Sequence, residues 1–247
     1  HAQAAVASAA AVDWIAALAT DEGPGRAQWG PGVEDYATLP ALDGDDLPVP
    51  TTNGDEVMQI IHTSGTTGDP KGIVLTHRRF CDTAAAALQA FGSRHDDRLY
   101  SGLSLTHANA LQVTLAPALL GGLPVVFSRR FTRSRLWSLT RQYRCTSFTL
   151  LGGMTTTLYA EPPRADDADN PVRFVVAAGM PAAIWQAFER RFGVAVLEFY
   201  GSAEGGLAVN PVGAGPVGSI GRIAPHLSSR IVDDAGADVP RGTPGQL

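Results

Sequence analysis

Two kinds of hydrophobic pattern alternate along the chain from residue 57 onward. Short apolar runs rich in Val, Ile and aromatic residues predict strands, and they occupy residues 57–62, 73–75, 99–105, 124–127, 146–151, 172–177 and 194–200. Stretches with helical spacing lie between them, at residues 77–91, 108–120, 132–144, 154–160 and 181–192. Such alternation is typical of a layered α/β fold with flanking helices and a largely parallel sheet.

The two ends of the chain depart from this alternation. The spacing of apolar residues predicts a helix over residues 4–19, and a polar connection rich in Gly and Pro follows over residues 21–55. Residues 162–170 read as a solvated loop. Beyond the last predicted strand the chain consists of short β-prone pieces between glycines and prolines. We therefore expect an α/β core over residues 1–204 and the start of a small β-rich subdomain over residues 205–247.

Composition restricts the classes of partner. With 247 residues and 45% hydrophobic content the chain can bury a large core, and its net charge of −5 argues against a nucleic-acid or anionic-membrane surface. The longest apolar stretch, residues 115–127, is interrupted by Pro and Gly and is shorter than the ~20 residues that a membrane span needs. The two cysteines, Cys81 and Cys145, fit reduced thiols. We expect a cytoplasmic protein with no transmembrane segment.

The distribution of basic residues draws attention to one position. Eighteen of the nineteen are Arg, and the single Lys is Lys71. Where a compact charge must reach phosphate oxygens from a tight loop, the broad guanidinium group is a poor substitute for the ammonium group. Lys71 is therefore a candidate phosphate ligand.

Lys71 lies at the end of a loop rich in glycine and hydroxyl groups, between two predicted strands. The loop reads T-S-G-T-T-G-D-P-K-G, and its candidate phosphate ligands are Thr63, Ser64, Gly65, Thr66, Thr67, Gly68 and Lys71. Backbone N–H groups and hydroxyls of such a loop can surround a polyphosphate. The loop is not a Walker A loop, because Pro70 precedes the lysine and Gly72 leads into a strand. Read alone, it also fits a glycine-rich hairpin that binds no ligand.

This loop resembles the signature loop of the adenylate-forming superfamily, which includes acyl-CoA synthetases, peptide-synthetase adenylation domains and luciferases. The resemblance covers about residues 55–247 and implies an ATP site in which Thr67 and Lys71 act on the phosphates. A second segment, S-L-T-H-A-N-A-L at residues 104–111, resembles the border of the carboxylate pocket in acyl- and aryl-CoA synthetases. The resemblance assigns that role to His107, although a histidine at a helix N-terminus fits equally well. The segment has no Asp to bind an amino-acid amine, which disfavours a peptide synthetase.

Two further segments each follow a predicted strand. The first, A-A-G-M-P, resembles an adenine wall made by Ala178, Gly179, Met180 and Pro181; by itself it also fits an ordinary strand-to-helix turn. The second, E-F-Y-G-S-A-E, resembles a nucleotide segment made by Glu198, Phe199, Tyr200, Gly201, Ser202, Ala203 and Glu204. The resemblance implies that Tyr200 stacks on adenine and that Glu204 binds Mg²⁺. The alternative for this pair is a core tyrosine and a solvated glutamate. Ala203 replaces the usual Thr, at a cost of about 0.5–1.5 kcal/mol for one neutral hydrogen bond.

The resemblance is strongest to the carnitine/crotonobetaine-type and fatty-acid-transport-type CoA ligases. It implies that a substrate carboxylate attacks the α-phosphorus of ATP, that pyrophosphate leaves, and that coenzyme A then displaces AMP from the acyl adenylate. Lys71, the loop amides and Mg²⁺ would stabilise the developing charge. The identity of the acid is open, and so is a homodimer.

Members of this superfamily carry a second catalytic lysine on a small mobile C-terminal domain, and this chain has no second lysine. We therefore expect the chain to be the middle portion of a larger enzyme, without its lid domain, and expect the fragment alone to be unable to adenylate at a normal rate. Two alternatives remain: an acyl-AMP ligase or adenylation domain that loads a carrier protein, and a catalytically silent homologue that binds nucleotide or acyl groups.

Overall fold

The computed structural model describes residues 15–17, 33–35, 53–63, 71–128, 130–211 and 213–247. The chain divides into two compact units, residues 1–51 and residues 52–247. In the first unit, β1 (Ile15–Ala17) pairs in parallel with β2 (Val33–Asp35). The helix expected over residues 4–19 is therefore wrong at β1, because pairing with a distant segment overrides local helical spacing. The rest of that predicted helix lies outside the described residues.

The second unit is built around a seven-stranded sheet with the order β11-β10-β9-β8-β7-β5-β6. Its strands are β5 (Leu99–Ser101), β6 (Val125–Phe127), β7 (Ser147–Leu151), β8 (Phe174–Ala178), β9 (Ala195–Gly201), β10 (Leu207–Val209) and β11 (Arg222–Ile223). The five strands from β6 to β9 are parallel, whereas β10 is antiparallel to both of its neighbours. The α/β fold with a largely parallel sheet is confirmed.

Two details of the sheet differ from the sequence pattern. The strand expected over residues 99–105 ends at Ser101. After residue 204 the chain first extends the main sheet, because β10 pairs with the end of β9. The boundary between residues 204 and 205 stays a prediction.

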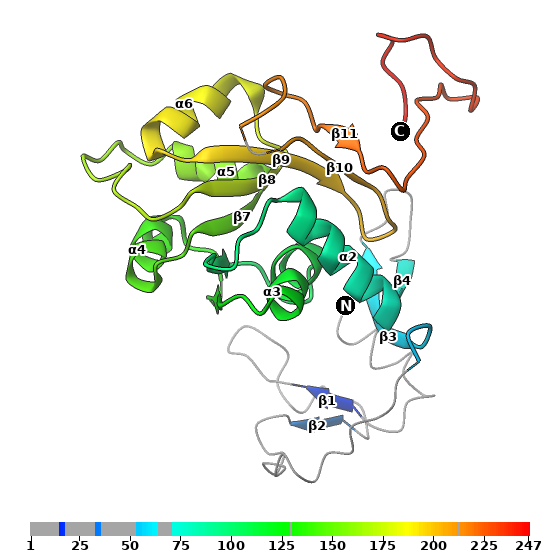
Figure 1. The fold of residues 1–247 in the computed structure, drawn as a ribbon, viewed down its shortest axis with the longest axis horizontal. Helices are drawn as coiled ribbons and strands as arrows, with labels where there is room; N and C mark the ends of the chain where they lie inside the picture. The colour runs from blue at the N-terminus through cyan, green and yellow to red at the C-terminus, as the bar shows by residue number, and fades with distance from the viewer. Residues whose placement is uncertain (1–14, 18–32, 36–52, 64–70, 129, 212) are drawn as a thin grey trace. The chain divides into compact units, whose positions relative to one another are not determined.

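Helices cover both faces of the sheet (Figure 1). They are α2 (His77–Ala90), the π-helix η4 (Asn109–Leu115), α3 (Ala116–Gly121), α4 (Arg133–Tyr143), α5 (Gly152–Tyr159) and α6 (Ala182–Phe192). Successive strand residues point to opposite faces. In β8, Phe174 and Val176 pack with Phe91 after α2, while Val175 and Ala177 pack with the side chains of α4, α5 and α6.

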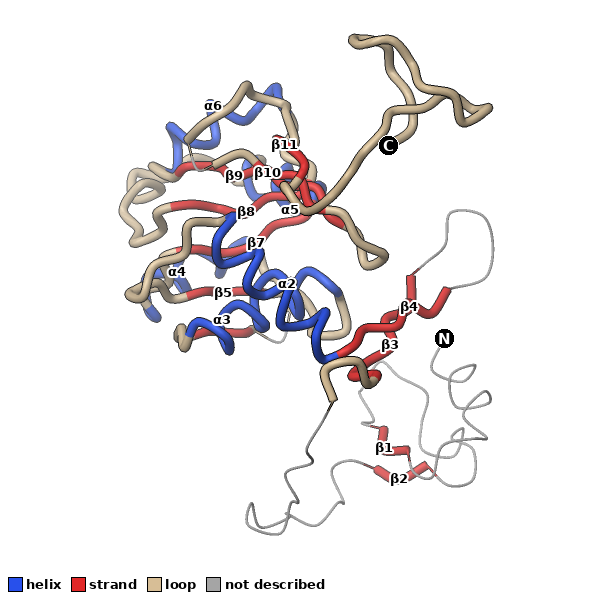
Figure 2. Tube along the Cα trace, turned by 45° about the vertical axis from the view of Figure 1, so that its right-hand side comes forward, coloured by secondary structure: helices blue, strands red, loops and turns tan. Residues whose placement is uncertain are grey.

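A separate hairpin leads directly into α2 (Figure 2). It consists of β3 (Val57–Thr63) and β4 (Lys71–Thr76), and its last antiparallel pair joins Thr63 to Lys71. Thr76 ends β4 and caps α2, because its side-chain oxygen accepts a hydrogen bond from the Arg79 amide. Residues 64–70 of the glycine loop lie outside the described residues.

At the amino ends of the strands, a buried carboxylate joins three of them. Asp97 precedes β5 and is 1% exposed. Its oxygens accept hydrogen bonds from the Arg94 amide, the Thr146 hydroxyl before β7 and the Arg173 guanidinium before β8. The ion pair with Arg173 measures 2.6 Å. Burial raises the pKa of Asp97, but these hydrogen bonds outweigh burial and hold that pKa below its ordinary value.

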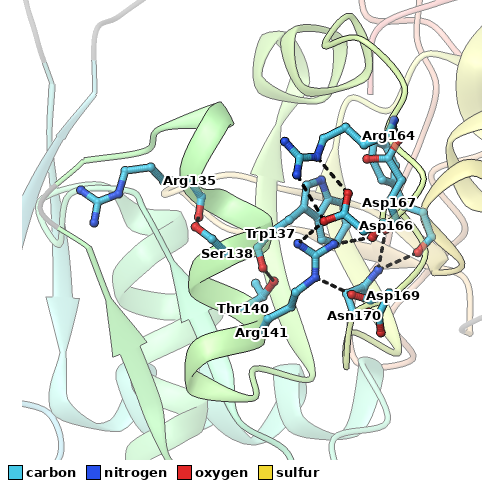
Figure 3. A network of polar contacts seen from close by, with 11 residues as sticks. Arg135, Trp137, Ser138, Thr140, Arg141, Arg164, Asp166, Asp167, Asp169 and Asn170 are labelled. Carbon is cyan, nitrogen blue, oxygen red and sulfur yellow. Dashed lines mark hydrogen bonds and ion pairs between the residues drawn. The ribbon is translucent and has the colours of Figure 1, made fainter.

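The segment expected to be a solvated loop, residues 162–170, is tied to the helices by two arginines. Arg141 of α4 donates to the carbonyl oxygens of Asp166 and Asp169 (Figure 3). Arg191 of α6 forms an ion pair of 2.7 Å with Asp167, which is buried. The loop prediction is therefore wrong in one respect, because the segment has a buried anchor that its polar composition conceals. Among the described helices, none is both long and apolar enough to cross a bilayer.

Candidate active site

A cavity of about 780 Å³ opens at the carboxyl ends of the parallel strands. Its wall includes Thr106 and His107 after β5, Leu151 at the end of β7, Ala178 at the end of β8 and Gly201 at the end of β9. Strand β5 lies between β6 and β7, so the connection from β5 to β6 and the connection from β6 to β7 run in opposite directions across the sheet. Ligands of open α/β sheets bind at such a change of direction, outside the carboxyl ends of the strands. The cavity therefore has the position of a substrate site.

One side of the cavity is formed by α2 and the hairpin that precedes it. Ile61 and His62 of β3 line it, together with Arg79, Thr83 and Ala87 of α2. The α2 residues are spaced four apart, so they share one helical face. That face changes from a cation near the helix N-terminus to a small apolar residue further along. On this side the cavity wall thus includes both a charged and an apolar group.

The turn after β8 is held by a buried carboxylate. Glu198 is 5% exposed, and its two oxygens accept hydrogen bonds from the amides of Gly179 at 2.7 Å and Met180 at 2.8 Å. Burial raises the pKa of Glu198, and the two amide hydrogen bonds partly oppose the rise. Gly179 has φ +91°, and a Cβ there would lie 3.4 Å from the Gly152 Cα. Glu198 therefore holds the backbone of the turn that was predicted to form the adenine wall.

The segment after β9 is held by two short hydrogen bonds and by apolar packing. The Ser202 hydroxyl donates to the Gly205 carbonyl oxygen at 2.7 Å, and the Arg79 guanidinium donates to the Ala203 carbonyl oxygen at 2.6 Å. The Ala203 methyl group packs against the apolar cluster that contains Ile61. A small side chain at position 203 is thus part of the packing between this segment and β3.

His107 lines the cavity with an exposed side chain. Its Nδ1 atom accepts a hydrogen bond of 3.1 Å from the Asn109 amide. With Nδ1 acting as acceptor, a neutral imidazole carries its proton on Nε2. In this arrangement His107 can donate a hydrogen bond from Nε2 to an anionic ligand.

Other predicted site residues are placed in different ways. Phe199 lines the cavity and packs edge-on against Phe91, with ring centroids 5.7 Å apart, so it is also a core residue. Tyr200 is 37% exposed, and Glu204 is exposed. Pro181 is the N-cap residue of α6.

The phosphate-loop candidates are only partly described. Lys71 is exposed at the start of β4, opposite Thr63. Ser64, Gly65, Thr66, Thr67 and Gly68 lie outside the described residues. Within the described part of the chain, no three His, Cys, Asp or Glu side chains form a metal cluster.

Sequence reasoning assigned no role to several polar residues that line this cavity, among them Arg79, Asn109 and Gln112. Arg79 has the appearance of a solvated helix residue, and no local signal relates it to the Ala203 carbonyl group. Asn109 belongs to the segment at residues 104–111 whose resemblance assigned a role only to His107, and Gln112 lies in a stretch that the sequence predicts only as helix. Their positions depend on how η4 packs beside α2.

Comparisons with known proteins agree over most of the chain. A family model described as AMP-binding enzyme matches residues 3–247. The medium/long-chain-fatty-acid–CoA ligase FadD17 of Mycobacterium tuberculosis is 34% identical over 194 residues, which make up 78% of this chain and 38% of that protein. Long-chain fatty acid transport protein 1 of Homo sapiens is 35% identical over 183 residues, 72% of this chain and 28% of that protein.

A solved structure of ATP-bound MatB from Rhodopseudomonas palustris is also similar. The TM-score is 0.69 with 26% sequence identity, and the match covers 78% of this chain and 39% of that one. The chain spans less than two-fifths of the length of the curated relatives described above.

Proposed function

The chain belongs to the family of AMP-binding enzymes, and on this premise we propose that the protein activates a carboxylic acid with ATP and transfers the acyl group to coenzyme A. The observation that carries the proposal is the cavity at the carboxyl ends of β5, β7, β8 and β9. Segments that the sequence associates with the nucleotide and with the acyl carboxylate both contribute to its wall. Their meeting in one cavity is what a reaction between ATP and a carboxylate requires.

In the proposed reaction, a carboxylate oxygen of the acid attacks the α-phosphorus of ATP. The new P–O bond forms as the bond to pyrophosphate breaks, which gives an acyl adenylate. The thiol of coenzyme A then attacks the acyl carbon and loses its proton, and AMP leaves with the electron pair of the C–O bond. No protein side chain becomes covalently bound, so the site needs positioning and charge stabilisation.

Each part of the site has a proposed role in this reaction. The adenine ring lies against Ala178, Gly179 and the aromatic ring of Tyr200. The phosphates contact the loop from Thr63 to Lys71. The Nε2–H group of His107 donates a hydrogen bond to the carboxylate of the acid. The hydrogen bond that Nδ1 accepts from Asn109 supports this role, because it leaves the hydrogen of a neutral imidazole on Nε2.

Magnesium is the proposed metal, and Glu204 its protein ligand. An exposed carboxylate fits this role because Mg²⁺ commonly binds one or two carboxylates and completes its shell with substrate phosphates and water. When bound, the ion neutralises charge on the phosphates. We propose the cytoplasm as the location, because ATP and coenzyme A are available there.

The test uses the full-length enzyme and a panel of fatty, aryl and small branched acids. Carboxylate-dependent release of pyrophosphate, with hydroxylamine trapping the adenylate as a hydroxamate, is the expected result. Coenzyme A and a phosphopantetheinyl carrier protein are compared as acceptors, and a preference for the carrier would replace the coenzyme A assignment. ATP binding without pyrophosphate release for any acid would instead indicate a silent homologue.

Lys71 variants test the phosphate role within the same assay. We expect Lys71→Met to lower kcat by about 10²-fold, which is typical for loss of one group that stabilises transition-state charge. Lys71→Arg, which keeps the charge, should retain part of the activity. Arg190→Met is the matched control, because it removes an exposed cation from α6, on the face of the sheet that packs away from α2. Equal rates for Lys71→Met and the control would refute the role of Lys71.

A further inference from the structure

The guanidinium group of Arg79 joins two segments that lie far apart in the sequence. It donates a hydrogen bond of 2.6 Å to the Ala203 carbonyl oxygen, in the segment after β9. It also donates a longer hydrogen bond of 3.4 Å to the Val74 carbonyl oxygen of β4. Arg79 and Ala203 both line the cavity, so this connection is made at the cavity wall.

The backbone of Arg79 is held at the start of α2. Its amide donates a hydrogen bond to the side-chain oxygen of Thr76, the N-cap residue of the helix. Strand β4 begins at Lys71 and ends at Thr76, so it runs into α2 without a loop. The guanidinium group is therefore attached, through the first turn of the helix, to the strand that begins with Lys71.

The turn on the other side, residues 202–205, has few other attachments. Ser202 and Gly205 exchange backbone hydrogen bonds of 3.2 Å, and the Ser202 hydroxyl donates to the Gly205 carbonyl oxygen. Within the described part of the chain, these bonds stay inside the turn, and the bond from Arg79 ties it to another element. The Ala203 methyl group adds apolar packing. Loss of the Arg79 bond would therefore leave the turn without its polar attachment to α2.

The hydrogen bond to the Ala203 carbonyl group also orients the residue that follows. Because the peptide group is planar and trans, the direction of this carbonyl group sets the opposite direction of the Glu204 amide. The Tyr200 ring lies against Gly206, on the far side of the turn, since a Cβ at Gly206 would be 3.4 Å from Cε1 of that ring. The position of the turn thus affects both Tyr200 and Glu204.

We propose that Arg79 is a positioning residue that holds the turn at residues 202–205 against the start of α2. The turn then keeps Tyr200 and Glu204 next to ATP bound at the phosphate loop. This inference rests on the proposed function, because it takes Tyr200 and Glu204 as ligands of the nucleotide and its metal. In this role Arg79 acts through the Ala203 carbonyl group and does not contact ATP.

The first measurement is pyrophosphate release by the full-length enzyme with Arg79→Met, which keeps the aliphatic part of the side chain and removes its donors. A hydrogen bond with one charged partner contributes about tenfold to 10²-fold to an equilibrium. We therefore expect KM for ATP, with Mg²⁺ in excess, to rise by about tenfold or more. KM for the acid should stay unchanged. Arg79→Gln is neutral and shorter and should give the same result, so it carries the test if Arg79→Met folds poorly.

The second measurement is hydrogen exchange of residues 200–206, followed by mass spectrometry in the enzyme without ATP or acid. Without the bond from Arg79 the turn should open more often, so that its backbone amides exchange faster. We expect exchange of these amides to be faster by about tenfold or more in the Arg79 variants. This readout reports the turn directly and needs no catalytic activity.

Arg141→Met is the matched control. Arg141 also extends from a helix and donates to backbone carbonyl oxygens of a distant loop, at Asp166 and Asp169, but it does not line the cavity. Its loss should speed exchange at residues 162–170 and leave exchange at residues 200–206 unchanged. KM for ATP should also stay unchanged. The control thus separates an effect on the ATP site from a general loss of stability.

The inference requires both changes in the Arg79 variants. Unchanged exchange at residues 200–206 would overturn it even if KM for ATP rises, because Arg79 would then act on ATP by another route. Unchanged KM for ATP, a rise confined to KM for the acid, or an equal rise in Arg141→Met would also overturn it. Absence of pyrophosphate release with every acid would overturn the proposed function, and the exchange measurement would still decide whether Arg79 holds the turn.

Discussion

An Asp97→Asn substitution changes the hydrogen-bonded carboxylate that joins the amino ends of β5, β7 and β8. The carboxylate accepts from the Arg173 guanidinium at 2.6 Å, from the Thr146 hydroxyl at 2.7 Å and from the Arg94 amide at 2.7 Å. An asparagine has an NH₂ group in place of one carboxylate oxygen, and this group cannot accept a hydrogen bond from the donor that it faces. It also leaves Arg173 without its counter-charge.

The expected loss follows from burial. Breaking a buried ion pair by changing one partner costs about 3–5 kcal/mol. Asp97 is 1% exposed, but the Arg173 side chain is 31% exposed, and water can solvate its charge in the variant. We therefore expect a decrease of about 3 kcal/mol in the free energy of unfolding at pH 7. For a domain of this size that corresponds to a melting temperature lower by roughly 6–12 °C.

The effect should depend on pH in a defined direction. The folded-state pKa of Asp97 lies below its ordinary value. Its contribution is present above the pKa of the unfolded chain, which is about 4, and is lost as pH falls through the folded pKa. The difference in unfolding free energy between wild type and Asp97→Asn should therefore be full at pH 7 and should shrink below about pH 4.

Denaturant unfolding followed by circular dichroism at pH 7 and at about pH 3 measures both effects. Asp96→Asn is the matched control, because Asp96 is exposed beside Asp97, and it should change stability by less than about 0.5 kcal/mol. Asp97 lies at the amino ends of the strands, opposite the cavity, so initial rates well below the melting temperature should match wild type. A stability loss equal to that of Asp96→Asn would refute the reasoning. A difference in unfolding free energy between wild type and Asp97→Asn that is larger at pH 3 than at pH 7 would refute the pH argument.

Two further predictions concern buried groups. Glu198→Gln replaces one carboxylate oxygen by an NH₂ group that faces the backbone amide of Gly179 or Met180. Part of the loss is offset because a charge is no longer buried, so we expect denaturant unfolding to show about 1–2 kcal/mol of destabilisation. Unchanged stability would show that the carboxylate does not hold this turn. Burial raises the pKa of the Cys145 thiol to about 11, whereas Cys81 is exposed. Iodoacetamide at pH 8 should therefore modify Cys81 and spare Cys145 in the folded protein, which peptide mass spectrometry measures. Equal labelling of the two cysteines would contradict the burial of Cys145.

Most of the elements in the second unit follow from local sequence pattern. The strands at residues 57–62, 146–151 and 194–200 and the helix at residues 132–144 were predictable, because apolar alternation and helical spacing reflect which side of an element is buried. The extra residues at the ends of β3 and β9 depend on partner strands. So does β1, whose residues have helical spacing but pair with β2.

Several segments that line the cavity were identified from sequence, but the contacts of many side chains could not be. The segments after β8 and β9 were assigned to the nucleotide by their resemblance to the adenylate-forming superfamily, and each was predicted to follow a strand. In the structure, the Glu198 carboxylate accepts hydrogen bonds from the backbone amides of Gly179 and Met180. Composition and spacing cannot distinguish a carboxylate that binds a ligand from one that binds a neighbouring backbone.

The sequence by itself determined the α/β alternation, the glycine loop with its single lysine, and the order of the segments that surround the cavity, because these depend on local periodicity and residue type. Only the tertiary structure decided which polar groups are satisfied. Asp97 forms an ion pair with Arg173, and Glu198 accepts a hydrogen bond from the turn after β8. Within the described residues, three side-chain atoms of Asn109 and Gln112 are left buried without a hydrogen-bond partner. The hydrogen-bond partners of these groups come from distant segments of the chain, so they are known only once the elements have packed. Burial makes a missing partner costly.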